Sequence, residues 1–273
     1  MNSLGIDIGG TSVKGVAWDG EVWKQAQSET YAHPERAEIV RAVRSVIEQL
    51  KADADQRKSA GVCLPGRSAG DSSCIELSVN LPALNGWAFG AMFDAFGIDP
   101  ESTVCSDALA AGLDFVRTEQ LGGRAACISL GTGVGLSVFD DGVPVGIGAR
   151  GIGHLGMVSV GTGQTLEAVV GVRALRARFA DAVHDGIGAM GDDDPVIRAI
   201  VQAVGVVHAI YVPRSVVLLG GVGLALRAQR DRLDGLIRAQ HCPVADPDWV
   251  LRFGASAFHA AMGAARLAND PRS

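Results

Sequence analysis

The sequence has few cysteines, and they form no recognisable pair. Five cysteines are spread over 273 residues, an odd number, and no Cys-x-x-Cys spacing occurs. Disulfide frameworks use an even number of cysteines, and zinc ribbons use closely spaced pairs. The pattern therefore argues against both classes of protein, and we interpret the cysteines as buried, reduced thiols.

Long apolar runs and an excess of positive charge are lacking as well. No stretch approaches the roughly 20 apolar residues that span a bilayer, and no charged-then-apolar leader precedes the strand predicted from Leu4. The formal net charge of −6 argues against general binding to nucleic acid or to a membrane surface, although a local basic site stays open. We therefore expect a cytoplasmic protein without nucleic-acid or membrane partners.

Glycine, in contrast, is abundant. The chain contains 36 glycines, and 48% of its residues are hydrophobic. A length of 273 residues is long for one domain and natural for two, and the apolar content suffices for two cores. Glycine at this level suits a protein built of tight turns and close backbone approaches.

A glycine turn lies near the start of the chain, between two predicted strands in residues 4–16. Gly9, Gly10 and Thr11 form the turn, and Asp7 lies in the otherwise apolar strand before it. Glycines allow consecutive N–H groups to converge on an anion, and a carboxylate beside a phosphate can hold a hydrated Mg²⁺. The pattern indicates a phosphate site with Asp7 as a metal ligand through water, although an ordinary hairpin turn would also use glycine.

The same pattern occurs a second time in residues 127–142. The two copies align without a gap, Gly131 on Gly9, and the second turn consists of Gly131, Thr132 and Gly133. Such a repeat indicates a duplicated domain. Two glycine turns facing one cleft could hold a polyphosphate chain from both sides.

Hydrophobic periodicity predicts the order of the strands and helices. A strand, a hairpin and a crossover helix that leads back to a strand are typical of a mixed sheet with helices on its faces. Besides the two hairpins, the predicted strands span residues 21–27, 59–64, 103–106, 215–219 and 249–253. The predicted helices span residues 33–50, 86–96, 107–116, 162–180, 196–211 and 255–268.

Two polar stretches allow more than one interpretation. Residues 67–87 form a loop that is long for a compact domain, which indicates either a functional loop or a disordered one. Asp192, Asp193 and Asp194 resemble a metal-binding run, but acids directly before Pro195 and a helix are typical of a solvated helix N-terminus. We favour the helix N-terminus for the acidic run.

The order of these motifs resembles the ROK family of sugar kinases, within the actin-like ATPase and hexokinase superfamily. The resemblance covers nearly the whole chain. Its motifs in this sequence are Gly9-Gly10-Thr11, Asn80-Leu81-Pro82 with Trp87, Ser106-Asp107-Ala108, Gly131-Thr132-Gly133, Gly153-His154, Leu166-Glu167 and Leu219-Gly220-Gly221.

The resemblance implies an α/β protein with a duplicated actin-like ATPase (ribonuclease-H-like) fold. Two domains with mixed sheets flanked by helices would lie around a cleft. We expect residues 1–107 and the C-terminal helix, residues 254–273, in the N-terminal domain, and residues 108–253 in the C-terminal domain. Members of the family are often dimers, so we expect a homodimer.

The resemblance also implies roles for single residues. Asp107 would accept the proton of the attacking sugar hydroxyl, which needs a carboxylate within hydrogen-bond reach of that hydroxyl, although Asp is also a favoured helix N-cap. Both glycine turns would bind the phosphates of ATP, and Gly220 and Gly221 would belong to the adenosine motif. The implied sugar contacts are Asn80, Ser106, Asp107, His154 and Glu167, and Trp87 is interpreted as a core anchor.

Three features depart from the family pattern. Ser106 replaces the usual Asn, Gly151 replaces a sugar-binding Glu, and no cysteine lies between Leu155 and Leu166, so the family's zinc site is expected to be absent. Loss of a charged hydrogen bond to substrate would weaken binding by about 1.5–3 kcal/mol. The substrate could differ from glucose, Arg150 or another residue could replace the lost carboxylate, or catalysis could be lost. Because the base and both turns are intact, we favour an altered substrate over an inactive enzyme.

Lys14 raises the question of the phosphate donor. Its spacing from the first glycine turn, together with the missing zinc cysteines, also resembles the polyphosphate-using glucokinases of the family. A cation at this place could meet a longer anionic donor. A solvated strand lysine is the other interpretation, and the one we favour.

The sequence thus predicts an enzyme, a glucokinase-like sugar kinase that uses ATP and Mg²⁺. One alternative is a polyphosphate-dependent sugar kinase. A second is a non-catalytic nucleotide and sugar sensor without DNA contacts, because the strand predicted from Leu4 leaves no room for the helix-turn-helix of the family's repressors. A third is an ATPase that acts on a protein partner.

Overall fold

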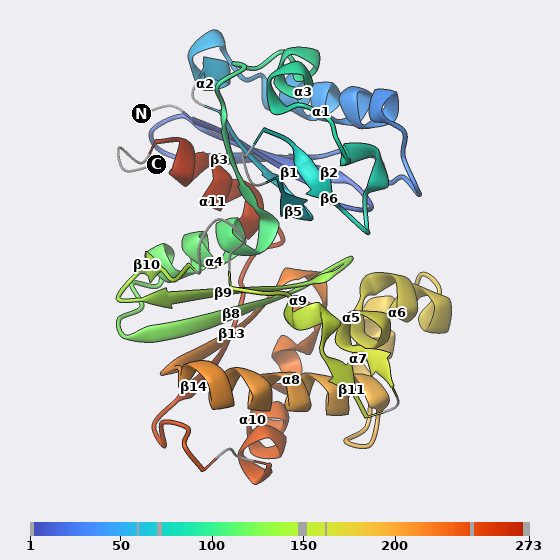
Figure 1. Cartoon of the computed structure of the whole chain (residues 1–273), viewed down its shortest axis with the longest axis vertical. Helices are drawn as coiled ribbons and strands as arrows, with labels where there is room; N and C mark the ends of the chain where they lie inside the picture. Colours follow the sequence, from blue (N-terminus) through green and yellow to red (C-terminus); the bar gives the residue numbers. More distant parts are fainter. Residues whose placement is uncertain are drawn as a thin grey trace. The chain divides into compact units, whose positions relative to one another are not determined.

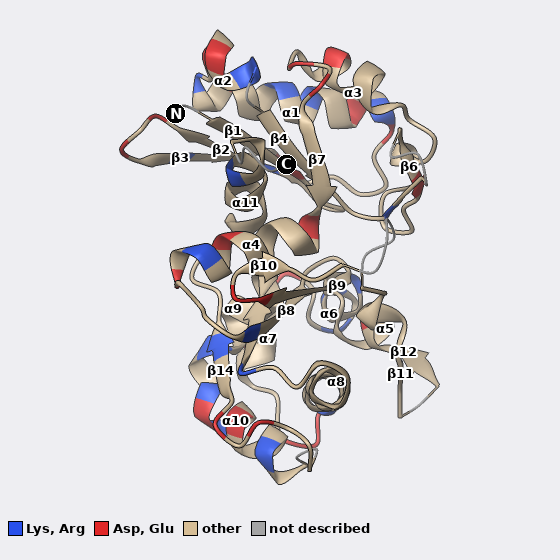
Figure 2. Ribbon diagram, turned by 60° about the vertical axis from the view of Figure 1, so that its left-hand side comes forward, with Lys and Arg blue, Asp and Glu red and all other residues tan. Residues whose placement is uncertain are grey.

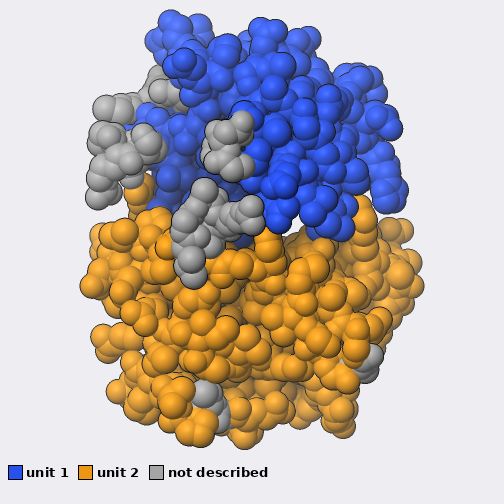
Figure 3. Space-filling view, viewed as in Figure 1, with its two compact units in different colours: residues 1–114, 148–150, 258–273 blue, residues 115–147, 151–257 orange. Residues whose placement is uncertain are grey.

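The chain divides into two compact units. The computed structural model describes residues 3–58, 60–69, 73–146, 152–161, 163–240 and 243–269. Unit 1 comprises residues 1–114, 148–150 and 258–273, and unit 2 comprises residues 115–147 and 151–257 (Figure 3). Each unit has its own mixed sheet and its own hydrophobic core.

The sheet of unit 1 has five strands in the order β3-β2-β1-β4-β7. The antiparallel part comes from consecutive hairpins, and the parallel part follows crossover helices. Its strands are β1 (Ser3–Ile8), β2 (Val13–Trp18), β3 (Trp23–Gln27), β4 (Ala60–Leu64) and β7 (Thr103–Ser106). The first glycine turn joins β1 to β2, as the sequence predicts. It therefore lies at one end of this sheet.

Helices cover both faces of this sheet. On one face α1 (Arg36–Leu50) packs beside α3 (Phe89–Phe96), and on the other lies α11 (His259–Ala268), as Figure 1 shows. A Cβ atom at Gly15 would meet Val46 of α1 at 2.4 Å, whereas one at Gly5 would meet the Ala261 carbonyl of α11 at 1.9 Å. Small residues on the strands thus let the backbone of α11 rest directly on the sheet.

A buried carboxylate holds α11 against α4 (Asp107–Thr118), the helix that follows β7. The Asp114 side chain is 2% exposed, and its two oxygens pair with His259 Nδ1 and Arg266 Nε, each at 2.6 Å. Buried charges are stable only when they are paired. The last helix, α11, thus lies against the sheet of unit 1, and it begins at His259 and not at residue 255.

The sheet of unit 2 repeats the plan of unit 1. Its order is β10-β9-β8-β13-β14, with an antiparallel hairpin at one side and parallel strands at the other. The strands are β8 (Arg124–Leu130), β9 (Val134–Asp140), β10 (Val143–Pro144), β13 (Ser215–Leu219) and β14 (Val250–Phe253). The duplicated α/β architecture with mixed sheets and flanking helices is therefore confirmed.

The helices of unit 2 include a break that the sequence did not predict. The helix expected over residues 162–180 is two helices, α5 (Leu166–Val170) and α6 (Val172–Phe179), joined at Gly171 with an extended ψ of 146°. The other helices are α7 (Val183–Gly188), α8 (Pro195–Tyr211), α9 (Gly220–Leu226) and α10 (Arg230–Ala239). Figure 1 shows α8 and α10 side by side, and both contact the sheet.

Charged residues of both signs occur together on single helices. Figure 2 shows this for α2 (Ala54–Lys58) and for α10. In α2, Lys58 Nζ lies 3.8 Å from Asp55 Oδ1, and in α10, Arg238 Nε lies 2.7 Å from Asp234 Oδ2. None of the helices that the structure describes combines the length and the apolar character needed to cross a membrane.

The acidic run before α8 forms ion pairs and a helix cap. Asp192, Asp193 and Asp194 pair with Arg232, Arg198 and Arg178, respectively. Asp194 also accepts the Val196 N–H at 3.0 Å, so it caps α8. The interpretation of the acidic run as a helix N-terminus is therefore confirmed. Asp194 is not solvated, however, because its side chain is only 6% exposed.

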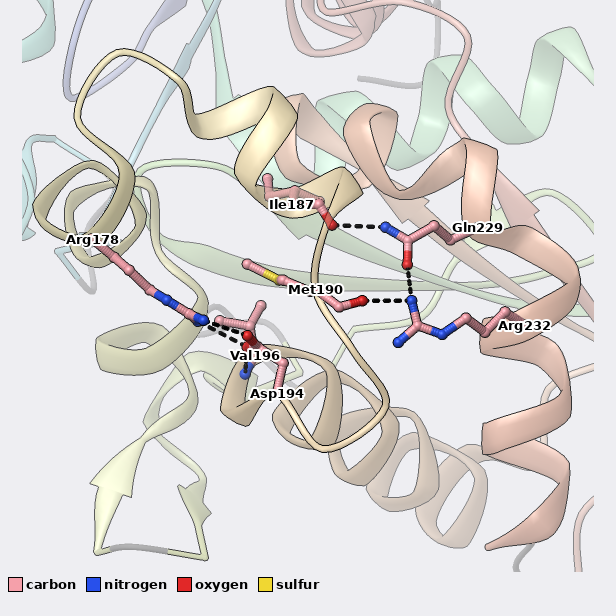
Figure 4. Close-up of polar contacts among 7 residues, drawn as sticks. All are labelled: Arg178, Ile187, Met190, Asp194, Val196, Gln229 and Arg232. Atoms are coloured by element: carbon pink, nitrogen blue, oxygen red, sulfur yellow. Dashed lines mark hydrogen bonds and ion pairs between the residues drawn. The ribbon is translucent and has the colours of Figure 1, made fainter.

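The same region links helices of unit 2 through bonds to backbone carbonyls and through an ion pair, as Figure 4 shows. Gln229 Nε2 donates to the Ile187 carbonyl at 2.7 Å, and Arg232 Nη1 donates to the Met190 carbonyl at 2.6 Å and to Gln229. Arg178 forms a bidentate pair with Asp194 at 2.9 and 2.6 Å. These contacts tie the ends of α6 and α7 to α8 and α10.

Replacement of Asp194 by Ala is expected to destabilise the protein by about 1–3 kcal/mol at pH 7, because a helix cap and a charge-assisted pair are lost together. Burial raises the pKa of Asp194, but hydrogen bonds from Arg178 and from the Val196 N–H outweigh it and hold the pKa below its ordinary value. The stabilisation is therefore present above about pH 4 and is lost as the pH falls through the lowered pKa.

Urea denaturation of wild type and variant at pH 7 and at roughly pH 3 measures this difference. Asp193→Ala is the matched control, since this side chain is 91% exposed and pairs only at the surface; such pairs contribute about 0–1 kcal/mol. An equal effect of Asp194→Ala at both pH values would contradict the assignment.

The described cysteines form no disulfide. Cys63 and Cys127 are buried, and Cys74 and Cys105 are half-buried. Burial raises the pKa of Cys127 well above that of a free thiol, so this thiol stays protonated. Cys242 lies outside the described residues.

Candidate functional site

The first glycine turn presents backbone donors at the end of the unit 1 sheet. The Gly9 N–H donates to the Ser12 carbonyl at 3.1 Å, which closes the turn. Within the part of the chain that the structure describes, the N–H groups of Gly10, Thr11 and Ser12 have no protein acceptor. Such a series of free N–H groups can bind an anion, as the glycine pattern predicts.

Asp7 lies in a row of polar side chains that crosses the same sheet. In the strand register, Asp7 is opposite Lys14 on β2 and Cys63 on β4, and Cys63 is opposite Cys105 on β7. The Cys63 thiol donates to Asp7 Oδ1 at 3.6 Å. Burial raises the pKa of Asp7, and Lys14 and the Cys63 thiol only partly offset this.

Asp107 lies close to the same row, at the junction of β7 and α4. Burial, together with the negative charges of Asp7 and Asp107, raises the pKa of the Cys63 and Cys105 thiols far above the ordinary value. Both carboxylates therefore act on one pair of thiols. The structure thus brings the predicted metal ligand and the predicted base to the same end of the unit 1 sheet.

Ser106, and not Asp107, caps α4. Ser106 Oγ accepts the Leu109 N–H at 3.2 Å, whereas Asp107 Oδ1 accepts the N–H of the next residue, Ala108, at 2.8 Å. The N-cap interpretation of Asp107 is therefore wrong. Helix capping accounts for a hydroxyl at position 106.

The stretch predicted as a long loop is ordered in the described residues 73–87. It contains β6 (Ile75–Leu77), which pairs with β5 (Arg67–Ser68), and a 3₁₀ turn, η1 (Pro82–Leu84). Within it, Ser78 Oγ accepts the Leu81 N–H at 3.2 Å and Asn85 Oδ1 accepts the Ser78 N–H at 2.6 Å. The disordered alternative is therefore wrong for these residues.

Arg36 of α1 holds this loop from outside. Its guanidinium donates to the carbonyls of Ala83 and Asn85, both at 2.9 Å, and lies 5.1 Å from the centre of the Trp87 ring. Trp87 is 8% exposed and packs edge-on against Phe96, which confirms its role as a core anchor. The half-buried Asn80, the predicted sugar contact, therefore lies in a braced segment.

The second glycine turn also leaves N–H groups free. The Gly131 N–H donates to the Gly133 carbonyl at 2.9 Å, and in the described residues the N–H groups of Thr132 and Gly133 have no protein acceptor. The Val172 N–H, at the start of α6, donates to the Gly131 carbonyl at 2.9 Å. The joint between α5 and α6 thus fixes the turn.

Glu167 binds the far end of this turn. Its Oε2 accepts the Val134 N–H at 2.9 Å, and a Cβ atom at Gly156 would lie 3.1 Å from the same oxygen. The predicted sugar contact therefore also braces the second glycine turn. His154 is exposed and precedes η3 (Leu155–Met157), which packs against α5, so His154 and Glu167 come from neighbouring elements.

Gly220 and Gly221 open α9 directly after β13. Gly220 has a φ of +78°, and a Cβ atom there would lie 2.3 Å from the Leu130 carbonyl, one residue before the second turn. Only glycine fits such a contact. The predicted adenosine motif and the second glycine turn therefore lie at the same end of the unit 2 sheet. Gly151, the departure from the family's Glu, lies outside the described residues.

The residues present fit a magnesium ion held through water. In the described part of the chain, no three or more His, Cys, Asp and Glu side chains are arranged to hold a metal directly. Mg²⁺ keeps several waters and uses one or two carboxylates together with substrate phosphates. Asp7, a single carboxylate next to free N–H groups, matches that arrangement.

Comparison with protein families identifies a match. The model of the ROK family matches residues 3–270, almost the whole chain. No curated protein sequence is similar enough to count as a relative.

Solved structures share the fold. An inorganic polyphosphate/ATP-glucomannokinase from Arthrobacter sp. strain KM is 22% identical, with 98% of each chain covered and a TM-score of 0.71. A ROK glucokinase from Streptomyces griseus, solved with glucose and AMPPNP, is 17% identical, with 98% of this chain and 99% of that chain covered and a TM-score of 0.75. A ROK transcriptional regulator, a homologue of the E. coli MLC protein, is 17% identical, with 98% and 78% covered and a TM-score of 0.72.

Proposed function

The chain belongs to the ROK family, and we propose that it is a kinase that transfers the γ-phosphoryl group of ATP to a hydroxyl of a sugar or sugar-like molecule. One observation carries the proposal. Asp7 is paired with Cys63 in the strand register, Cys63 is paired with Cys105, and Asp107 directly follows the strand of Cys105, at the end of a sheet whose first turn has free N–H groups. Phosphoryl transfer needs an acid that holds a metal, a base for the hydroxyl, and donors for phosphate oxygens.

Each group would perform one task. The free N–H groups of the two glycine turns would bind phosphate oxygens, and Gly220 and Gly221 would lie against the adenosine. A hydrated Mg²⁺ held by Asp7 would neutralise phosphate charge during transfer. Asp107 would accept the proton of the sugar hydroxyl as that oxygen attacks phosphorus. Asn80, Ser106, His154 and Glu167 would orient the sugar.

Two alternatives have specific support. Lys14 lies opposite Asp7 in the strand register, where a second cation would suit a polyphosphate donor, and a similar fold occurs in a glucomannokinase that uses polyphosphate or ATP. A similar fold also occurs in a transcriptional regulator, which favours a non-catalytic sensor as the second alternative.

An ADP-release assay tests the proposal. Mg-ATP is supplied with a panel of hexoses, N-acetylhexosamines and polyols, and polyphosphate is supplied in parallel with detection of the phosphorylated sugar. A rate that depends on the acceptor would establish the kinase and identify the substrate class. Nucleotide binding without stimulation by any acceptor would contradict the proposal and favour the sensor.

Use of ATP is consistent with a cytoplasmic enzyme. We also propose that the protein is a homodimer, and light scattering in solution would test this oligomeric state.

Replacement of Arg36 by Ala is expected to raise the KM for the sugar about tenfold, with the KM for ATP unchanged. The variant loses the two hydrogen bonds from Arg36 to the backbone of the loop that contains Asn80. A loss of about 1.4 kcal/mol in sugar binding corresponds to a factor of ten in KM. Steady-state kinetics with either substrate varied measure the difference.

Arg44→Ala is the matched control for this variant. Arg44 is also on α1, and its side chain donates to the Ala95 carbonyl at 2.8 Å, outside the loop. The sugar KM of this control should match wild type. An equal rise of the sugar KM in both variants would show that Arg36 affects sugar binding only through the general stability of the protein.

A further inference from the structure

Tyr31 contacts the first glycine turn through two separate groups. Its hydroxyl donates to the Gly9 carbonyl at 2.6 Å, and its backbone N–H donates to the Thr11 carbonyl at 2.9 Å. The residue lies beyond β3 and is distant from the turn in sequence. One residue thus holds two of the peptide groups from which the turn is built.

These two bonds determine where the free N–H groups point. A trans peptide is planar, and its C=O and N–H groups point in opposite directions. The Gly9 carbonyl shares its plane with the Gly10 N–H, and the Thr11 carbonyl shares its plane with the Ser12 N–H. Because Tyr31 binds both carbonyls, the N–H groups of Gly10 and Ser12 are directed away from Tyr31.

The bond from the Tyr31 hydroxyl is durable. Tyr31 as a whole is 8% exposed, so water has little access to compete for the Gly9 carbonyl. Burial, with the charges of Asp7 and Glu38, raises the pKa of Tyr31 above its ordinary value. The hydroxyl therefore keeps its proton, and it remains a donor throughout the physiological pH range.

Neighbouring residues extend this brace past the turn. The Ser28 N–H donates to the Val13 carbonyl at 2.9 Å, Ser28 Oγ accepts the Val13 N–H at 3.0 Å, and Gln27 Nε2 donates to Ser12 Oγ at 3.1 Å. These contacts lie on the β2 side of the turn. Within this group, Tyr31 alone binds the carbonyl at Gly9, where the chain leaves β1.

We propose that Tyr31 is a positioning residue that orients the Gly10 and Ser12 N–H groups toward the phosphates of the bound nucleotide. The inference rests on the proposed function, because it assumes that this turn receives phosphate. It gives Tyr31 a role in the affinity for phosphate groups and none in the recognition of adenosine or of the sugar.

The test is Tyr31→Phe, which keeps the ring and removes only the hydroxyl. Titration calorimetry of the whole protein would compare adenosine, AMP, ADP and ATP, each with Mg²⁺. Loss of one hydrogen bond corresponds to a roughly three- to tenfold change, so the Kd for ATP should rise by that factor while the Kd for adenosine stays unchanged. The KM for ATP should rise equally, without a change in the KM for the sugar.

Tyr211→Phe is the matched control. The chain has only two tyrosines, and the Tyr211 hydroxyl also donates to a backbone carbonyl, that of Ile152, at 3.2 Å. Its loss should leave the gain in affinity from adenosine to ATP as in wild type. A general loss of stability would weaken all four ligands alike, so the dependence on phosphate number separates positioning from packing.

Three outcomes are decisive. The inference is supported if the affinity increases less from adenosine to ATP in Tyr31→Phe than in wild type and in Tyr211→Phe. The same increase in affinity in all three proteins would overturn the inference while leaving nucleotide binding, and with it the proposed function, intact. If the affinity of the wild-type protein itself does not increase from adenosine to ATP, both the proposed function and this inference are overturned.

Discussion

Asp107→Asn is expected to lower kcat by about 10²- to 10⁴-fold, the usual contribution of a general base. The amide has nearly the same shape and its oxygen can still accept the Ala108 N–H, which Asp107 Oδ1 accepts at 2.8 Å. It cannot accept the proton of the attacking hydroxyl. The substrates should therefore still bind, because only the reaction step loses its base.

The measurement combines the ADP-release assay with calorimetry of nucleotide binding. Asp55→Asn is the matched control, since Asp55 is also an acid in the first turn of a unit 1 helix but is exposed, and its turnover should equal that of wild type. Turnover of Asp107→Asn within tenfold of wild type would remove Asp107 from the role of base. Loss of nucleotide binding in the same variant would indicate a structural defect.

The glycine turns and the duplicated fold could be predicted from the sequence because their requirements are local. Gly9 and Gly131 each close a turn between two adjacent strands, and the short range of the contacts leaves a visible pattern. The same holds for Trp87 and for the cap before Pro195. Even such local patterns can be wrong by one residue, because the cap of α4 is Ser106 and not Asp107.

The braces of the candidate site could not be predicted in this way. Tyr31, Arg36 and Cys63 act on the turn, the loop and Asp7 only after the strands and helices have assembled. The one available signal for Tyr31 was its rarity, one of two tyrosines in the chain. Rarity alone does not identify a partner.

The break in the helix of residues 162–180 has the same cause. A helix pattern continues through Gly171, and a single glycine costs only about 1 kcal/mol. In the folded chain, however, a Cβ at Gly171 would lie 2.6 Å from the Glu167 carbonyl and 3.0 Å from the Thr132 carbonyl, so glycine lets this joint pack closely against the second turn. The joint also donates the Val172 N–H to that turn, a contact between residues far apart in the sequence that a helix pattern does not show.

Gly61→Ala is expected to destabilise the protein strongly. A Cβ atom at this position would lie 1.9 Å from the carbonyl oxygen and 2.4 Å from the carbonyl carbon of Ala264. Both are backbone atoms of α11, so no side-chain rotation can relieve the overlap, and the helix must move away from the sheet. We expect a loss on the order of 4–5 kcal/mol, with a fall in Tm of roughly 8–20 °C.

Thermal and urea unfolding would measure this loss, with Gly90→Ala as the matched control. Gly90 is in α3 of the same unit, with no atom within 4 Å of an added Cβ, so alanine there should be neutral or slightly stabilising. Wild-type stability of Gly61→Ala would show that α11 does not rest on the sheet. Because Ala260 and Ala264 of α11 pack with Cys63 and Cys105, any Gly61→Ala protein that folds should also bind Mg-ATP more weakly, through displacement of the side chains beside Asp7.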